Sequence, residues 1–255
     1  MNDKEAEKSQ GAAGRALDVF EVFAALHEPM SLTELSARIE APLSTCHNLV
    51  RVLQLRGYVY ALDHPRRFYP SKRIFEIASA IATHDPIVQR VLPILTALRD
   101  ATGETVIIGK RQGDEVIYLE VIEGTHLIRY REEPGARKPL HSSAIGKAVL
   151  GSMDDDALAA FLRGRTFAQK TDRTIVAADR LLQDLSVSRE RGYYMTVGEN
   201  VSEVEAIAIV THMVGQTLAI ALAGPISRMQ EHQAALVTAL RTCQLEIDKA
   251  NVNRA

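Results

Sequence analysis

The sequence has no long apolar segment and very few cysteines. No run of apolar residues approaches the roughly 20 needed to cross a bilayer, and the polar N-terminus lacks the hydrophobic region of a secretory signal. We therefore expect a cytoplasmic protein with no membrane partner. Its two cysteines, Cys46 and Cys243, are far apart and neither has a partner at metal-ligand spacing. A disulfide is not expected, and Cys46 is interpreted as a small buried apolar group.

Residue patterns typical of catalysis, metal binding and nucleotide binding are also missing. The eight histidines are scattered, and none lies three or four residues from another, the spacing that puts two ligands on one helix face. Walker and dinucleotide-binding glycine motifs are absent. His141, Ser142 and Lys147 could be combined into a nucleophile site, but no Gly-x-Ser-x-Gly elbow surrounds the serine. We therefore expect a protein that is not an enzyme and that has no metal and no cofactor. A hydrolase stays as the alternative.

Residues 31–57 have the pattern of a helix-turn-helix. Ser31 and Glu34 are spaced as a capping box, which predicts that a helix starts at about Leu32. Pro42 cannot donate the hydrogen bond that would continue this helix, so a turn should follow. A second helix is predicted by apolar side chains at helical spacing, namely Cys46, Leu49, Val50 and Leu53.

The opposite face of this second helix carries hydrogen-bonding side chains: Thr45, His47, Asn48 and Arg51. A recognition helix in the major groove needs such groups, because short donors near its N-terminus reach phosphates and an asparagine or arginine pairs with base edges. The alternative is an ordinary amphipathic helix with a hydrated polar face. Periodicity alone does not separate the two.

A basic hairpin is predicted after the second helix. Two short β-prone runs, Tyr58–Leu62 and Phe68–Pro70, flank the turn Asp63–Arg67. A helix-turn-helix followed by a hairpin is the order of a winged helix-turn-helix. With a first helix at about 15–27, it predicts a DNA-binding domain over residues 10–72.

The charge distribution supports this interpretation. From Ser36 to Arg73 there are seven Lys or Arg against two Asp or Glu, although the whole chain has a net charge of −2. A local basic excess is what phosphate binding with counterion release requires.

The length of 255 residues favours two domains. The helical pattern of 72–84 predicts a linker helix over 73–85, which can transmit orientation. Residues 86–255 are predicted to form an α+β domain, because adjacent β runs joined by short turns imply an antiparallel sheet flanked by helices. The predicted strands are 105–110, 116–122, 127–131, 193–197, 206–214 and 217–223; the predicted helices are 86–101, one from Ser143, one capped by Asp154, 175–191 and 228–250.

The helix predicted to start at Ser143 is a candidate anion site. Its first residues are small, so a ligand could approach its free amides and the positive end of its dipole. Ser142 and Ser143 could add hydroxyl donors, and His141 or Arg129 could add charge. The alternative is that Gly146 and Ala148 only let the helix pack tightly on the sheet.

These stretches together resemble the isocitrate-lyase-regulator (IclR) family of bacterial transcription factors over about residues 14–245. The resemblance rests on the following residues: Arg15-Ala16-Leu17, Leu32–Gly57 with Ser44-Thr45-Cys46-His47, Pro139–Ser142, Gly146–Ala148, Gly192-Tyr193, Glu199, and Gly224-Pro225 with Arg228. The resemblance implies an α+β chain with an N-terminal winged helix-turn-helix, a linker helix and a C-terminal GAF-like effector domain.

The resemblance also implies site residues. Those expected to face DNA are Ser44, Thr45, His47, Asn48 and Arg51, with Arg66 and Arg67 on the wing. The amides of Ala144 and Ile145 are expected to hold an effector carboxylate. The expected effector-binding residues are Tyr130, Ser142, Ala144, Ile145, Gly146, Thr196 and Ala206.

The chain departs from the family pattern in ways that affect specificity. Asn48 stands where arginine is frequent, which predicts a different base preference, since asparagine favours adenine and arginine guanine. Thr196 and Ala206 replace a frequent aspartate and cysteine, and Val210 or Thr211 replaces a familiar proline. A smaller, less polar pocket wall follows. It favours a larger carboxylate, such as an aromatic acid beside Tyr130, over a glyoxylate-like ligand.

We therefore predict a ligand-responsive regulator of the IclR type. A small carboxylate metabolite would control binding to double-stranded operator DNA of a catabolic operon, as in a repressor. Symmetric DNA binding predicts a homodimer or a dimer of dimers. The effector has to bind the DNA-competent and incompetent arrangements unequally, with the helix at 72–84 as transmitter. The alternative is a second domain that mainly drives oligomerisation.

Overall fold

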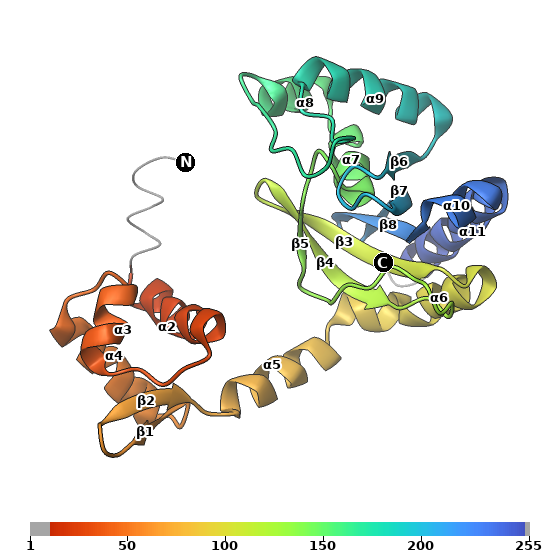
Figure 1. The fold of residues 1–255 in the computed structure, drawn as a ribbon. Coiled ribbons are helices and arrows are strands. Elements are labelled where there is room, and N and C mark those ends of the chain that lie inside the picture. Colours follow the sequence, from red (N-terminus) through yellow and green to blue (C-terminus); the bar gives the residue numbers. More distant parts are fainter. Residues whose placement is uncertain (1–10, 253–255) are drawn as a thin grey trace. The chain divides into compact units, whose positions relative to one another are not determined.

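The computed structural model describes residues 11–252 (Figure 1). The chain divides into two compact units between His84 and Asp85. Each unit has its own buried core and is described by itself.

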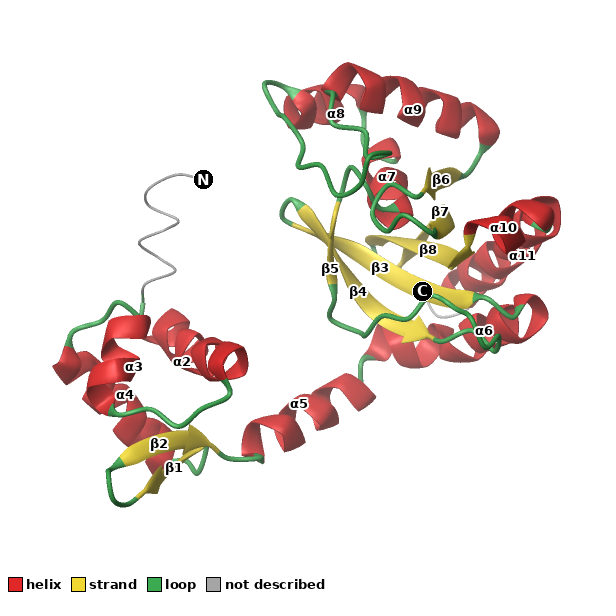
Figure 2. Cartoon of the chain, in the orientation of Figure 1, coloured by secondary structure: helices red, strands yellow, loops and turns green. Residues whose placement is uncertain are grey.

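The N-terminal unit is a three-helix core with a hairpin and a final helix (Figure 2). Its helices are α2 (Ala12–Leu26), α3 (Leu32–Arg38), α4 (Leu43–Leu55) and α5 (Arg73–Thr83), and its antiparallel strands are β1 (Val59–Leu62) and β2 (Arg67–Pro70). Apolar side chains from the three helices and both strands form one core, which includes Val19, Phe23, Leu35, Cys46, Val50, Val59 and Phe68. The predicted winged helix-turn-helix is present.

The helix-turn-helix begins as predicted but turns earlier. The Ser31 hydroxyl accepts from the Glu34 amide at 3.3 Å, and the Glu34 carboxylate accepts from the Ser31 amide at 2.8 Å. This confirms the capping box. However, α3 ends at Arg38, and Glu40 has a φ of +47°, so the chain has already turned before Pro42. Pro42 instead occupies the N-cap of α4.

The C-terminal unit is built on one six-stranded antiparallel sheet in the order β5-β4-β3-β8-β7-β6. The strands are β3 (Thr105–Gln112), β4 (Glu115–Ile122), β5 (Arg137–Pro139), β6 (Tyr194–Val197), β7 (Val204–Met213) and β8 (Gln216–Pro225). Its helices are α6 (Pro86–Thr102), α7 (Ala144–Gly151), α8 (Asp155–Leu162), α9 (Ala178–Arg191), α10 (Ile226–Glu231) and α11 (Gln233–Val252).

Strand alternation divides this unit into two cores, one on each face of the sheet. Ile107 packs with α7, α8 and α9, whereas its neighbours Val106 and Ile108 pack with α6 and α11. Successive side chains of a strand point to opposite faces, so both faces of β3 are apolar and buried. The predicted α+β sheet with flanking helices is confirmed, and Figure 1 shows α7 on one side of it and α6 on the other.

Two predicted elements of the C-terminal unit are wrong. Residues 127–131 form an irregular loop rather than a strand, and the strand at this sheet edge is β5. Leu127 is 99% exposed, so this stretch has no buried face to stabilise a strand. The single helix predicted over 228–250 is two helices, α10 and α11, because the chain breaks at His232.

Two buried acidic residues, Glu104 and Glu205, lie next to Gly224 of β8. Gly224 lies opposite Glu205 in the register of β7 and β8, and a Cβ on Gly224 would lie 2.2 Å from Glu104 Oε2. Glu104 is ion-paired with Arg228, whose Nη2 donates to Glu104 Oε2 at 2.9 Å. Glu205 is fully buried and neither of its carboxyl oxygens has a hydrogen-bond partner within the described residues. Burial raises the pKa of Glu205, and the side chain of Gln230 partly offsets this shift.

The raised pKa of Glu205 predicts a pH-dependent stability. The folded state binds the carboxyl proton of Glu205 more tightly than the unfolded state does. The stability gained from this proton is therefore fully present below the pKa of the unfolded state, and it is lost as pH rises through the pKa of the folded state. Glu205→Gln keeps the shape without the titration, so its urea midpoint should exceed that of wild type increasingly as pH rises above about 4.3. The exposed Glu203→Gln serves as control. A Glu205→Gln variant less stable than wild type at every pH would contradict this account.

Candidate DNA-binding face and effector cavity

The outer face of α4 is polar and exposed. Ser44, His47, Asn48 and Arg51 are exposed and Thr45 is half-buried, whereas Cys46 and Val50 point into the core. None of the five polar side chains hydrogen-bonds to another group in residues 11–252. They are therefore available to an external partner.

The two arginines of the wing have different surroundings. Arg66 is exposed, with its guanidinium 5.7 Å from the centre of the Phe68 ring. Arg67 donates to the carbonyl of Pro29 at 2.7 Å and to Glu34 Oε1 at 3.1 Å. The Ser31 amide and hydroxyl, followed by the charge of Arg67, lower the pKa of Glu34. Arg67 thus ties the wing to the start of α3, whereas Arg66 has no ion pair within the described residues.

The start of α7 carries unpaired amides in the interior. Ser143 is the N-cap, and its hydroxyl accepts from the Gly146 amide at 3.2 Å and donates to the Pro139 carbonyl at 2.7 Å. The amides of Ala144 and Ile145, the first two of the helix, have no acceptor in the described part of the chain. Both residues are buried, at 3% and 1% exposure. The helix therefore presents two donors that its own fold leaves unused.

Gly146 has a packing role. A Cβ at this position would lie 2.4 Å from the Leu140 carbonyl oxygen and 2.5 Å from the Leu140 Cα. Only glycine lets α7 approach the preceding segment this closely. Its amide is already bonded to Ser143. Gly146 was expected among the effector-binding residues, but the structure places it outside the cavity lining.

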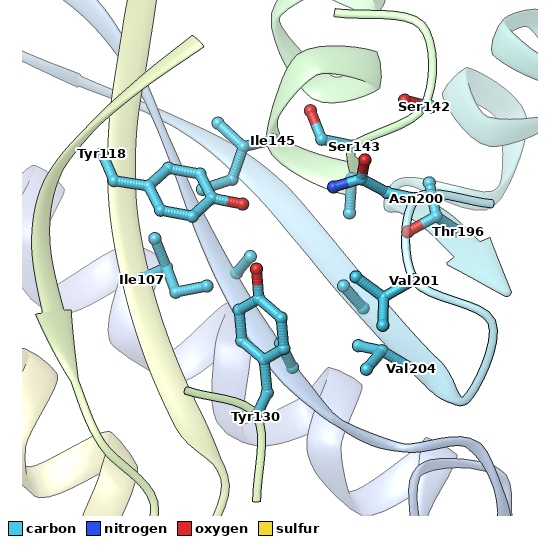
Figure 3. A pocket seen from close by; sticks show the side chains of 14 residues that line it. Ile107, Tyr118, Tyr130, Ser142, Ser143, Ile145, Thr196, Asn200, Val201 and Val204 are labelled. Carbon is cyan, nitrogen blue, oxygen red and sulfur yellow. The ribbon is translucent and has the colours of Figure 1, made fainter. Parts of the chain in front are cut away.

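A small cavity lies against the start of α7 (Figure 3). Its volume open to the centre of a water molecule is about 30 Å³. The other predicted effector residues all line it: Tyr130, Ser142, Ala144, Ile145, Thr196 and Ala206. Ser143, expected as a hydroxyl donor, lines it too, and the lining residues not foreseen in the sequence are Ile107, Tyr118, Asn200, Val201, Val204, Ala221 and Ala223.

The alanines of the lining lie at defined positions in the register of β7 and β8. Ala223 is the cross-strand partner of Ala206, and Ala221 lies two residues earlier on the same face of β8. Strand pairing is what brings these alanines beside the predicted Ala206. Because side chains alternate between the two faces of a strand, the sequence could have placed Ala221 and Ala223 on the same face of β8. It could not have shown that β7 is the strand next to β8.

The polar part of the lining contains an unsatisfied group. Ser142 is fully buried and its hydroxyl oxygen has no hydrogen-bond partner within residues 11–252. In Figure 3, Ser142, Ser143, Thr196 and Asn200 lie on one side of the cavity. The sequence signal for this wall was the run of small polar residues before α7.

A buried ion cluster supports the cavity from behind. The ammonium of Lys147 is fully buried, 2.7 Å from Glu199 Oε1 and 3.0 Å from Asp184 Oδ2. Burial raises the pKa of Glu199, although Lys147 opposes the shift. Glu199 precedes Asn200 and Val201 of the lining, so the cluster connects α7, α9 and the 198–203 loop.

The expected alternative nucleophile site is not assembled. His141 stacks on Phe167, with ring centres 4.8 Å apart, and its Nε2 lies 3.0 Å from the Ala168 carbonyl oxygen. Burial lowers the pKa of His141. The Ser142 hydroxyl has no hydrogen-bond partner within residues 11–252, and Lys147 is held in its ion cluster. Arg129 pairs with Glu123 at 2.9 Å and does not line the cavity.

The described residues offer no metal site and no disulfide. Among the described residues, no group of three or more His, Cys, Asp or Glu side chains could hold a metal ion. Both cysteines are free and buried, as interpreted for Cys46, and the Cys46 thiol donates to the Leu32 carbonyl at 3.7 Å. Every helix among these residues is too short or too polar to span a lipid bilayer.

Known proteins share both halves of this architecture. Residues 79–249 match the model of the bacterial transcriptional regulator IclR C-terminal domain, and residues 12–63 match that of the IclR helix-turn-helix domain. The chain belongs to the IclR family. Family membership makes it a DNA-binding transcriptional regulator and not an enzyme.

Individual IclR-type proteins are similar along most of the chain. HTH-type transcriptional regulator BhcR of Paracoccus denitrificans is 32% identical, over 89% of this chain and 82% of that protein. The repressor AllR of Escherichia coli is 28% identical, over 89% and 84%. An IclR homologue from Microbacterium hydrocarbonoxydans, solved in complex with 4-hydroxybenzoate, has a TM-score of 0.77 at 19% identity and covers 95% and 100% of the two chains.

The ion cluster behind the cavity predicts a strong effect of one substitution. Lys147→Met should lower the stability of the C-terminal unit by about 3–5 kcal/mol, because it leaves the carboxylates of Glu199 and Asp184 without their cation. Adding Glu199→Gln should recover part of the loss. Chemical denaturation measures both, with exposed Lys170→Met as control. A loss no larger than that of the control would show that the cluster does not stabilise the fold.

Proposed function

We propose that this IclR-type regulator binds a small organic monocarboxylate in the cavity at the start of α7. The observation that supports this proposal is the pair of unpaired amides of Ala144 and Ile145 beside the unpartnered hydroxyl of Ser142. A carboxylate would accept hydrogen bonds from these groups, and the positive end of the helix dipole favours its charge. Buried donors left without an acceptor are unfavourable, so the site favours an anion.

The size of the cavity limits the ligand. A volume of about 30 Å³ holds two or three water molecules, at about 10–15 Å³ for each. A short-chain acid could enter directly, whereas an aromatic acid requires movement of Tyr130 or of Val201, which is 43% exposed on the 198–203 loop. The 4-hydroxybenzoate bound by the Microbacterium hydrocarbonoxydans homologue supports inclusion of aromatic acids among the candidates.

The DNA contacts are proposed for the exposed face of α4 and for the wing. Ser44, Thr45 and His47 would contact the backbone and base edges near the start of the helix, and Asn48 and Arg51 would pair with bases. Arg66 would contact a phosphate. Arg67 would act through the fold, because its guanidinium already holds Pro29 and Glu34.

The regulator is proposed to act as a homodimer or a dimer of dimers. In the part of the chain that the structure describes, helix α5 exposes apolar side chains, including Phe75 at 71% and Ile81 at 69% exposure. A second copy of the chain would cover such a surface and would place two recognition helices on a symmetric operator. The predicted role is the repression of a catabolic operon in the cytoplasm, released or strengthened by the effector through unequal binding to two states.

The two wing arginines should respond differently to substitution. Arg66→Ala should weaken binding to every duplex sequence and lower the slope of log affinity against log salt by about one, without changing stability. Arg67→Ala should lower the unfolding midpoint of the N-terminal unit, because it removes the contacts with Pro29 and Glu34. Fluorescence anisotropy on a mixed-sequence duplex and thermal unfolding measure these effects.

Asn48→Ala provides the matched test of base readout. It should relax the preference at one base pair of sites selected from a random library, at a cost of about 1–3 kcal/mol, and leave the salt slope unchanged. If Arg66→Ala and Asn48→Ala both leave DNA binding as in wild type, α4 is not the recognition helix.

The carboxylate site can be tested by removing one amide from α7. Ala144→Pro deletes the first N–H but keeps the helix, because proline is tolerated there and Ser143 is already extended at φ −112°, ψ 143°. The variant should lose the rise in unfolding midpoint that a carboxylate causes in wild type. Ala144→Ser, which keeps the amide, should respond like wild type.

The panel for this test contains acetate, butyrate and benzoate, each with its hydroxylated analogue. Stabilisation of Ala144→Pro equal to that of wild type would count against the helix start as the carboxylate site. Absence of stabilisation by every acid would favour the alternative in which the second domain mainly drives oligomerisation.

A further inference from the structure

The outer edge of β7 is paired over only part of its length. Strand β6 pairs with Glu205 to Ala208 of β7, whereas β8 pairs with the whole of β7, from Val204 to Met213. The chain turns at Gly192, the C-cap of α9 with a φ of +80°, so β6 does not extend further along this edge. Beyond Ala208, the edge of β7 therefore has no neighbouring strand in the described part of the chain.

The β7–β8 hairpin shows which backbone groups this free edge presents. Met213 and Gln216 close a two-residue turn, and such a turn closes with a hydrogen-bonded pair. Because the pairs alternate, Val210 and His212 point their backbone groups away from β8. The Val210 carbonyl accordingly accepts from Gln244 Nε2 at 2.5 Å. The amides of Val210 and His212 and the carbonyl of His212 have no hydrogen-bond partner within residues 11–252.

The free edge forms one side of a groove of about 500 Å³. Its other sides include Tyr194 at the start of β6, Ser152 at the end of α7, and Gln244 and Leu245 of α11. Leu245 is 58% exposed. An extended segment laid in this groove would bond to the backbone of β7 and place alternate side chains on the walls, which is how peptides add to sheet edges.

The charge of the groove is positive. Its charged lining residues are Arg189 and Arg241, and no Asp or Glu of the described residues lines it. Arg189 is engaged, since its Nη1 lies 2.8 Å from Asp155 Oδ1. Arg241 donates to the Arg191 carbonyl at 3.1 Å and has no ion pair within residues 11–252. The charge of Arg241 is therefore available to a carboxylate on an incoming strand.

A second copy of this chain fits the groove poorly. Two copies of the same edge, paired about a two-fold axis, would bring Arg241 and His212 of one chain towards the same side chains of the other. Like charges opposite each other destabilise a strand pair. An acidic strand from another protein meets no such repulsion, so the charge of the groove favours it.

We propose that the free edge of β7 binds an extended acidic segment of another protein, which adds as a strand in line with β6. Its backbone pairs with the outward groups of Val210 and His212, and one of its carboxylates pairs with Arg241. The side chain of Gln244, which covers the Val210 carbonyl in the free protein, is displaced. The groove shares no residue with the α7 cavity, so this inference does not rest on the proposed carboxylate site.

Labelled peptides of defined sequence are the probes. The acidic peptide is Val-Glu-Val-Glu-Val, and the controls are Val-Lys-Val-Lys-Val and Val-Glu-Pro-Glu-Val, whose central residue cannot donate a hydrogen bond. Fluorescence anisotropy with the full chain measures their affinities. The acidic peptide should bind roughly tenfold more tightly than the basic one, since attraction to Arg241 replaces repulsion. The proline peptide should bind more weakly than the acidic one.

Variants of the groove assign the binding to its residues. His212→Pro removes one outward amide but keeps the β7–β8 ladder, because this N–H does not face β8 and proline is tolerated at a strand edge. It should abolish binding of the acidic peptide, whereas His212→Ala, which keeps the amide, should bind like wild type. Arg241→Gln should reduce the ratio of acidic to basic affinity to near one. Gln244→Ala should bind the acidic peptide several-fold more tightly, because the Val210 carbonyl is free.

The outcomes distinguish this inference from its alternatives. An acidic peptide that does not bind, that binds no better than the basic one, or that binds His212→Pro as it binds wild type would overturn the inference. Sedimentation velocity should give the same assembly mass for wild type, His212→Pro and Arg241→Gln. A lower mass for either variant would show that a second copy of the chain occupies the edge, and the proposal of an acidic partner would be wrong. Arg241→Gln keeps the test valid if His212→Pro fails to fold.

Discussion

The start of α7 is the constraint around which the C-terminal unit is arranged. A helix that begins in the interior exposes amides that its own backbone cannot satisfy. The fold satisfies one with the Ser143 hydroxyl and leaves those of Ala144 and Ile145 facing a cavity. Gly146 allows the close approach to Leu140 that buries this end, and Lys147 anchors the helix to Glu199 and Asp184. The same few residues thus set both packing and binding.

The walls of the cavity differ in how firmly they are held. Strands β3, β7 and β8 supply its apolar floor, and the 123–136 loop is hydrogen-bonded to β3 and β4. The 198–203 loop is held at Glu199, whose carbonyl accepts from Thr174 at 2.7 Å and whose carboxylate pairs with Lys147. Occupation of the cavity would therefore act on α7 and on this loop together, which is the kind of linked element that a ligand-controlled regulator needs.

Local signals in the sequence predicted most of the helices and strands, whereas the sheet edge and the place of several site residues depend on long-range pairing. The residues Ser31, Ser143 and Asp154 start the helices that they were expected to start, because a cap depends on residues within one turn. The strand expected at 127–131 is absent because a strand needs other elements to bury one of its faces. The sequence of the segment alone does not show whether such elements lie beside it. The same limit hid Tyr118 and Ala221, whose place in the cavity depends on sheet register, and the partners of Arg67, which lie more than thirty residues away.

Reciprocal linkage is the most direct test of the central claim that the α7 cavity controls DNA binding. The acid that most stabilises the protein would be titrated into the free protein and into its complex with a selected operator, and the operator would be titrated with and without the acid. If the cavity controls DNA binding, the acid should change the affinity for the operator, and the operator should change the affinity for the acid by the same factor. An acid that binds α7 with equal affinity in the free protein and in the complex would contradict the claim.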